Sequence, residues 1–219
     1  KWQGDNGTAD TIAKQFVSDD VDLSYSIATN ASQAAGNATG GTDIPVVFNA
    51  VTDGVEAKLV TSNELPGGNV TGVSDAAPLE KQLEMIREFL PKAKKIGMIY
   101  NIGEVNGKLQ VAQVEKLASK YNFKIVKKGV SATTEIATAA EQLAGDVDCI
   151  YNITDNMVVS ATASITDKAN AKNIPVFAAE DGQMKAGLLA SDSISYEKLG
   201  EQAGSVAYDI LVNGKKAGD

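Results

Sequence analysis

The 219-residue chain contains no histidine and a single cysteine, and only 5% of its residues are aromatic. Histidine is the commonest general base and a common metal ligand, so its absence weakens the case for acid–base catalysis and for a metal centre. The single cysteine, Cys149, allows neither an internal disulfide nor a thiolate metal cluster. Any function must come from carboxylates, hydroxyls, amides and backbone groups. This favours binding over catalysis, and we expect no cofactor and no metal.

Positive charge and long apolar runs are also scarce. The chain has 20 Lys+Arg and 28 Asp+Glu, which gives a net charge of −8. This charge argues against a nucleic-acid partner, because nucleic-acid binding needs a clustered basic surface. The longest clean apolar run, residues 44–48, falls far short of the ~18 residues of a membrane span. The chain does have 43% hydrophobic residues, enough for the core of one large domain or two small ones.

Short apolar runs alternate with helical patterns throughout the sequence. The predicted strands are residues 21–27, 44–50, 70–73, 95–100, 123–130, 147–153, 174–178 and 188–190. An apolar stripe at helical spacing runs from Leu79 to Leu90, where Pro91 ends it, and a second runs from Leu199 to Leu211. This alternation predicts an α/β fold of βαβ units, with a mostly parallel sheet and helices on both faces.

The chain contains an internal repeat. Shifted by 126 residues, residues 1–30 align with residues 127–156 without a gap, and nine of the thirty positions are identical. The shared core reads Asp-Val-Asp-x-x-Tyr-x-Ile-x-x-Asn, and each copy continues to an Ile-Pro-Val triplet. We interpret the repeat as two lobes of the same fold, although βα units can also resemble one another by chance.

The repeat predicts the extent of each lobe and a difference between them. We assign residues 1–75 and 191–219 to the first lobe and residues 76–190 to the second. The second lobe opens with a strand, residues 95–100, and a helix over about 105–121, for which the first lobe has no counterpart. Without this unit the first sheet would keep an unpaired edge and a half-exposed core. We therefore expect a longer protein, or another polypeptide, to supply it.

Polar loops follow the predicted strands, and parallel α/β sheets bind ligands at these carboxyl ends. The first lobe offers mainly neutral groups at helix N-termini, which suit a carboxylate. Its candidate residues are Thr29, Asn30, Ser32, Gln33, Thr52, Asp53, Ser74 and Asp75. The second lobe offers a more acidic set, which suits an ammonium group. Its candidates are Tyr100, Asn101, Glu104, Asn106, Thr154, Asp155, Asn156 and Glu180.

The two sets together predict a zwitterionic ligand, an α-amino acid. Ser32, Thr52 and Ser74 would hold its carboxylate. Its ammonium would pair with Asp155 first, and with Glu104 or Glu180 next. An alternative is that these residues are ordinary helix N-caps, which alone would explain Ser32, Thr154 or Asp155.

Several segments carry a resemblance to a known family. They are residues 12–16, 27–35, 44–53, 66–75, 100–104 and 154–156, of which Pro-Gly-Gly-Asn-Val-Thr-Gly followed by Ser-Asp is the most specific. Together they resemble the substrate-binding proteins of ABC importers with the type I periplasmic-binding-protein fold, in particular carriers of aromatic amino acids such as tryptophan. The chain departs from the family pattern at Asn30, where the family has proline, and at Gly107, where it has serine.

The resemblance implies two Rossmann-like lobes, a hinge, and a ligand between the lobes. It also implies an ABC permease as partner and a place outside the cytoplasmic membrane, lipid-anchored on a Gram-positive cell or free in a periplasm. We expect a monomer that is not an enzyme. The alternatives are a sensing domain of a receptor or regulator that binds a sugar or purine, and acid–base work on a sugar by a carboxylate pair such as Asp53 with Asp155.

Overall fold

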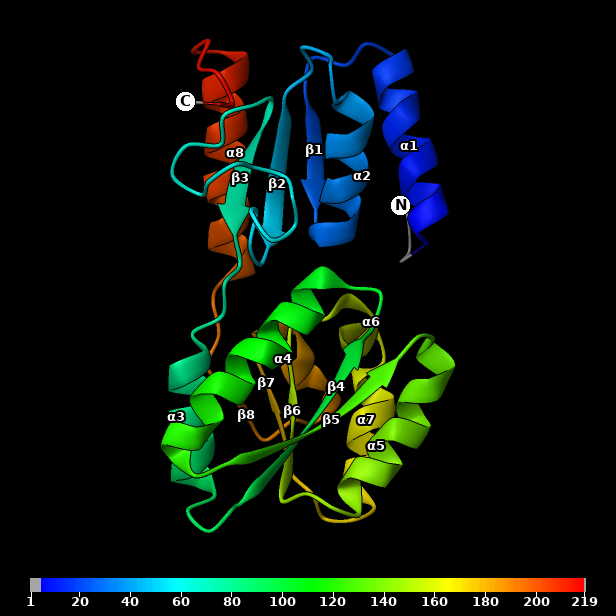
Figure 1. Cartoon of the computed structure of the whole chain (residues 1–219), viewed down its shortest axis with the longest axis vertical. Helices are drawn as coiled ribbons and strands as arrows, with labels where there is room; N and C mark the ends of the chain where they lie inside the picture. Colours follow the sequence, from blue (N-terminus) through cyan, green and yellow to red (C-terminus); the bar gives the residue numbers. More distant parts are fainter. Residues whose placement is uncertain (1–4, 219) are drawn as a thin grey trace. The chain divides into compact units, whose positions relative to one another are not determined.

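The computed structural model describes residues 5–218 and divides the chain into two compact units (Figure 1). Unit 1 comprises Lys1–Ala76 and Ser195–Asp219, and unit 2 comprises Ala77–Ile194. These boundaries leave residues 191–194 in unit 2, whereas the sequence prediction put them in the first lobe. The physical reason is that Ser191 pairs with Ala178 as part of the unit 2 sheet.

Unit 1 is a three-stranded parallel sheet with helices packed against it (Figure 1). Its elements are α1 (Asn6–Ser18), β1 (Ser24–Ile27), α2 (Thr29–Thr39), β2 (Val46–Val51), β3 (Val70–Ser74) and α8 (Tyr196–Leu211). The strand order is β1-β2-β3. Helix α2 packs on β1 and β2, α1 packs on α2, and α8 packs on β2 and β3. The Pro-Gly-Gly motif forms the turn before β3, where Gly67 has a φ of +80° that favours glycine.

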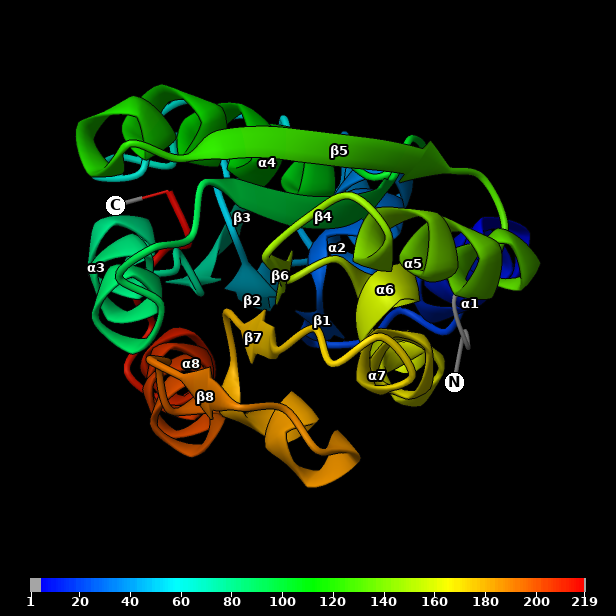
Figure 2. The same cartoon turned by 90° about the horizontal axis from the view of Figure 1, so that it is seen from below.

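Unit 2 is a five-stranded parallel sheet with the strand order β5-β4-β6-β7-β8. Its helices are α3 (Leu79–Phe89), α4 (Val105–Ala118), α5 (Ile136–Ala144), α6 (Asn156–Ser160) and α7 (Thr162–Asn170). Its strands are β4 (Lys95–Asn101), β5 (Lys124–Val130), β6 (Cys149–Asn152), β7 (Val176–Ala178) and β8 (Ala190–Ser191), with short 3-10 turns at Ser119–Tyr121, Thr133–Glu135 and Asp181–Ala186. Helices cover both faces of this sheet (Figure 2).

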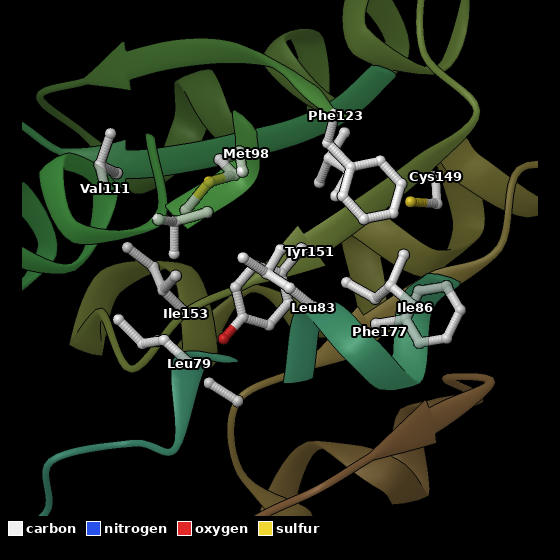
Figure 3. Packing of buried hydrophobic residues seen from close by; sticks show 14 of the residues in the cluster. Leu79, Leu83, Ile86, Met98, Val111, Phe123, Cys149, Tyr151, Ile153 and Phe177 are labelled. Carbon is white, nitrogen blue, oxygen red and sulfur yellow. The ribbon is translucent and has the colours of Figure 1, made fainter. Parts of the chain in front are cut away.

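Alternate residues of the unit 2 strands pack into two separate hydrophobic cores, one on each face of the sheet. Met98, Tyr151 and Phe177 point to the face covered by α3 and α4, and they pack with Leu83 and the other residues in Figure 3. On the opposite face, strand residues such as Ile150 pack against α5 and α7. Strands buried on both faces read as continuous apolar runs, which is the pattern that identified them in the sequence.

The predicted α/β class is confirmed, and each of the eight predicted strands is present. Strand ends differ by a few residues, because a strand ends where its backbone pairing ends, whereas an apolar run can continue past that point. The largest shift is at β1, predicted from Val21 and observed from Ser24. The first residue of the repeat, Lys1, lies outside the described residues. No described helix combines the length and apolar character that crossing a membrane requires.

Candidate ligand-binding site

In unit 1, helix α2 begins directly after β1 and has an uncapped N-terminus. Its N-cap residue is Ala28, whose side chain cannot accept a hydrogen bond from the first turn. Ala28 has φ 72° and ψ 158°, a backbone conformation that is strained for any residue that has a Cβ atom. The first-turn N–H groups, residues 29–31, have no helical carbonyl partner, so with the helix dipole they favour an anion. This end of α2 suits a carboxylate.

The predicted residues around the start of α2 have different roles. Ser32 is fully buried, and its hydroxyl donates to the Ala28 carbonyl at 2.8 Å and accepts from the Ser26 hydroxyl at 2.9 Å. Thr29 is also buried, whereas Asn30 is half-buried. Gln33 donates from Nε2 to the Ala57 carbonyl at 3.0 Å. Ser32 therefore joins β1 to α2, and a ligand would meet the backbone of this turn before it met that hydroxyl.

The loops after β2 and β3 are joined to each other. Ser74 is exposed, and its hydroxyl donates to the Thr52 carbonyl at 2.9 Å. Asp53 accepts from the amides of Val55 and Glu56, so it caps its own turn. Asp75 is buried and accepts from the Tyr196 hydroxyl at 3.5 Å. Of the predicted carboxylate-binding hydroxyls of unit 1, Ser74 is the one that the structure leaves exposed.

In unit 2, Glu104 is the centre of a buried hydrogen-bond network. Its carboxylate accepts from Asn106 Nδ2 at 3.2 Å, from Asn101 Nδ2 at 3.2 Å, and from Asn156 through both its amide at 3.1 Å and its Nδ2 at 2.7 Å. It also accepts from the Met157 amide at 3.3 Å. Only 3% of Glu104 is exposed. All of these donors are neutral, so the network holds the carboxylate in place without cancelling its charge.

Asp155 lies beside Glu104 and caps helix α6. One carboxylate oxygen accepts from the amides of Met157 and Val158, both at 3.1 Å, and the other accepts from the Asn101 amide at 2.7 Å. Burial and the neighbouring Glu104 charge raise the pKa of Asp155 to about 6, against the lowering effect of these amides. Among the ion pairs of the described residues, none involves Asp155 or Glu104. The two carboxylates thus form a buried acidic pair, with no cation paired to it from the described part of the chain.

Two residues of this cluster were not among the candidate site residues predicted from the sequence. Gln110 is buried on α4 and bonds Thr154 in both directions, accepting from its amide at 3.3 Å and donating to its hydroxyl. Gly107 lies against Asp155, where an added Cβ would come within 2.3 Å of Oδ2. The signal for Gln110 was its spacing of four residues from Asn106, which places both polar side chains on one buried helix face. Gly107, a departure from the family pattern, leaves room for the Asp155 carboxylate.

The remaining predicted residues of unit 2 flank this cluster. Glu180 follows β7 and is buried; one oxygen accepts from the Gly182 amide at 2.8 Å, and burial raises its pKa. Its other oxygen has no hydrogen-bond partner among the described residues. Asn106 donates to the Thr154 carbonyl at 2.9 Å, and Tyr100 is half-buried at the end of β4. The structure therefore brings Asn101, Glu104, Asn106, Thr154, Asp155 and Asn156 into one network, with Glu180 outside its hydrogen bonds.

This arrangement of α/β units with polar strand ends matches a known family. The model of the family described as ABC transporter substrate binding protein matches residues 1–219. The chain belongs to the ABC transporter substrate-binding protein family. It has the type I periplasmic-binding-protein fold. Proteins of this family bind substrates and are not enzymes, in agreement with the sequence prediction.

Relatives of this substrate-binding protein include proteins with amino-acid ligands in their names. It is 48% identical, over 99% of its length, to the tyrosine-binding protein of Clostridioides difficile. It superposes with a TM-score of 0.94 on a Streptococcus pneumoniae ABC domain in complex with L-Trp, at 34% sequence identity. This superposition covers 99% of the present chain and 74% of the S. pneumoniae chain. It superposes with a TM-score of 0.93, at 38% identity and 98% coverage, on 72% of a conserved domain protein from Vibrio cholerae.

The substrate-binding protein chain is shorter than these relatives. It spans 62% of the length of the C. difficile protein, and 61% of a Rickettsia prowazekii protein that is 23% identical. The region matched by the family model contains all of the candidate site residues discussed above.

Proposed function

We propose that this protein is the solute-binding component of an ABC importer and that its ligand is an α-amino acid, with an aromatic one as first candidate. The observation that carries the proposal is the buried Asp155–Glu104 pair. A pair of carboxylates that has only neutral donors lacks a counter-charge, and an ammonium group provides one without a further protein cation. In unit 1, considered by itself, the uncapped N-terminus of α2 complements a carboxylate, the other charged group of an amino acid.

The aromatic side chain of the proposed ligand is supported by the relatives. One is named a tyrosine-binding protein and another was solved with L-Trp. In the chain itself, Tyr100 is the aromatic residue nearest in sequence to Glu104, and it is half-buried at the end of β4. An aromatic ligand ring would stack on such a side chain or meet its edge.

Calorimetric titration of the complete gene product against the twenty amino acids, a sugar series and purines tests the proposal. We expect an amino acid to bind and the sugars and purines not to bind. Binding of a sugar or purine alone would overturn the importer proposal in its amino-acid form and favour a sensing domain of another ligand class.

Asp155→Asn tests the ammonium site. Asparagine keeps an oxygen that can cap α6 but removes the charge, so we expect amino-acid affinity to fall by roughly tenfold or more. Asp5→Asn is the matched control, because Asp5 caps helix α1 through the Thr8 amide and is not one of the candidate site residues. If both variants bind alike, Asp155 is only a helix cap.

The pH dependence of binding gives a second measurement. The pKa of Asp155 is about 6, and the proposed ammonium partner stabilises the charged carboxylate. Affinity should therefore weaken as pH falls through about 6, with proton release on binding just below that pH. In Asp155→Asn this dependence should be lost.

The importer role also places the protein outside the cytoplasmic membrane as a monomer that docks on a permease. Mass spectrometry of the mature N-terminus distinguishes a lipid-modified cysteine from a free periplasmic form. Sedimentation analysis checks the monomer.

A further inference from the structure

Unit 2 has a second concave surface, far from its acidic network. It is a groove with a volume of about 980 Å³, formed by α3, by the connection from α3 to β4, and by the start of β5. The strands of unit 2 are parallel, so their starts and their ends lie at opposite edges of the sheet. The acidic network follows the ends of β4 and β6, whereas the groove lies at the starts of β4 and β5. The groove is therefore separate from the candidate ligand-binding site.

The lining of this groove carries positive charge and no negative charge. Its basic residues are Arg87, Lys92, Lys94 and Lys124, and its other residues are neutral. We call this surface the basic groove. The whole chain has a net charge of −8, so a lining with four cations and no carboxylate departs from the composition of the protein. A local excess of one sign attracts a ligand of the opposite sign.

Arg87 is fixed in the basic groove by neutral partners. Its guanidinium donates to four backbone carbonyls, including those of Pro91 and Ala93, both at 2.9 Å. The guanidinium carbon also lies 4.0 Å from the centroid of the Phe123 ring, a residue of the unit 2 core (Figure 3). Among the ion pairs of the described residues, none includes Arg87. Its positive charge is therefore held in place without being neutralised.

The three lysines of the basic groove are exposed. Lys92 and Lys94 precede β4 and Lys124 begins β5. The five ion pairs found in the described part of the chain include none of these lysines. Their ammonium groups are thus available to an anion from outside the chain.

Two aspartates lie near the basic groove without lining it. Asp146 forms an ion pair with Lys95. Asp148 accepts from the amides of Lys94 and Lys95, at 2.7 and 2.8 Å. Even when both aspartates are counted, Lys95 and the four basic residues of the groove outnumber them. The local charge therefore stays positive.

The residue types and the size of the basic groove select a class of anion. Lysine ammonium groups recognise negative charge without the fixed geometry of an arginine fork. Ligand pockets usually have volumes of about 300–1,000 Å³, so a groove of about 980 Å³ has room for several linked anionic groups. Phe123, the aromatic residue of the lining, is only 7% exposed, so a nucleobase finds no ring on which to stack. A chain of phosphate groups without bases fits these features.

We propose that the basic groove binds a linear phosphate polymer that lacks nucleobases. Successive phosphates pair with Lys92, Lys94 and Lys124, and the fixed charge of Arg87 strengthens the attraction. Binding is salt-dependent, because each phosphate that a lysine neutralises releases counterions. Within unit 2 the polymer leaves the ends of the strands uncovered. This inference goes beyond the proposed importer function and does not depend on the identity of the imported ligand.

Fluorescence anisotropy with labelled inorganic polyphosphate tests the proposal on the complete gene product. The groove variant carries three substitutions, Lys92→Gln, Lys94→Gln and Lys124→Gln. The matched control removes the same charge at three exposed lysines outside the groove and outside the ion pairs of the described residues, through Lys14→Gln, Lys116→Gln and Lys172→Gln. Thermal unfolding checks that both variants fold.

We expect the groove variant to lose about tenfold or more in affinity for polyphosphate, and the control to stay within about twofold of the unmodified protein. The slope of log affinity against log salt should become shallower by about two in the groove variant, since a linear polyanion releases roughly 0.7 counterion per neutralised charge. Equal losses in both variants would show diffuse attraction and overturn the proposal.

Two competitors distinguish this polymer from other sources of phosphate. Phosphatidylglycerol vesicles present the charge on a lipid surface, and an oligonucleotide of equal charge presents it on a chain with bases. We expect unlabelled polyphosphate to displace the probe at a lower concentration than either competitor. More effective displacement by the vesicles or the oligonucleotide would overturn the proposal, as would a lack of polyphosphate binding by the unmodified protein at physiological salt.

Discussion

The two units place different chemistry at matched strand ends. Thr29 and Asp155 occupy equivalent positions of the repeat, each where a strand passes into a helix. In unit 1 helix α2 begins at Thr29, and its N-cap residue Ala28 provides no side-chain cap, whereas in unit 2 Asp155 caps α6 and shares a buried network with Glu104. One copy leaves N–H groups available and the other concentrates negative charge. The two copies of the repeat thus share a βα arrangement while the chemistry at their strand ends differs.

The largest expected effect tests the burial side of this comparison. Ile153→Ala should destabilise unit 2 by about 2–5 kcal/mol, because it leaves a cavity in a fully buried core. Ile27→Ala is the matched control, at the same position of the repeat. In the 219-residue chain it should cost less than about 1 kcal/mol, since Ile27 is largely exposed. Chemical denaturation measures both, and equal losses in this chain would contradict the difference in burial.

The next effect concerns the buried charge of unit 2. The pKa of Asp155 is raised in the folded state to about 6, so its contribution to stability is fully present below about pH 4 and lost as pH rises through 6. We expect a loss on the order of 2 kcal/mol over this window, measured by chemical denaturation at a series of pH values. Asp155→Asn should flatten the curve.

Asp148→Asn provides the control of opposite sign. The pKa of Asp148 is lowered by the amides of Lys94 and Lys95, so the stability that it contributes is present above its unfolded pKa and lost in acid. Its replacement should change the acid limb and leave the window from about pH 4 to about pH 7 alone. A flattened neutral window in Asp148→Asn would contradict the assignment to Asp155.

A smaller expected effect tests how tightly the chain packs around the acidic pair. Gly107→Ala should destabilise unit 2 by about 1–3 kcal/mol, because the new Cβ would overlap Asp155 Oδ2. Gly204→Ala is the control, since Gly204 lies in α8 with open space around the added Cβ. There we expect a gain of about 0.5–1 kcal/mol from helix propensity. Thermal unfolding of both variants checks the pair, and a neutral Gly107→Ala would show that the carboxylate can move.

The smallest effect tests the uncapped start of α2. Ala28→Gly should stabilise unit 1 by about 1 kcal/mol, because glycine adopts a φ of 72° without the Cβ penalty. Ala31→Gly, three residues later within the helix, should instead destabilise it by about 0.5–1 kcal/mol. Opposite signs in denaturant titrations confirm the strain at Ala28. A loss in both variants would place that strain elsewhere.

The sequence by itself determined the order of strands and helices and the repeat that relates the units. It could do so because the periodicity of apolar residues and the local composition depend only on neighbouring residues in the sequence. A buried parallel strand appears as a continuous apolar run, and a helix appears as apolar residues at helical spacing, as from Leu79 to Leu90. The sequence also identified the polar loops, because strand ends in a parallel sheet gather at one edge.

Only the tertiary structure decided which of those polar groups are already engaged. Ser32 and Asp53 were both candidates in the sequence, yet the Ser32 hydroxyl is buried between β1 and α2 and the Asp53 side chain caps its own turn. Glu104 and Asp155 become a pair through hydrogen bonds between residues about fifty positions apart. The exposures of Ile27 and Ile153 differ although the residues are identical. Burial and hydrogen bonding depend on residues that are distant in the sequence, and the local sequence pattern does not predict which distant residues come into contact.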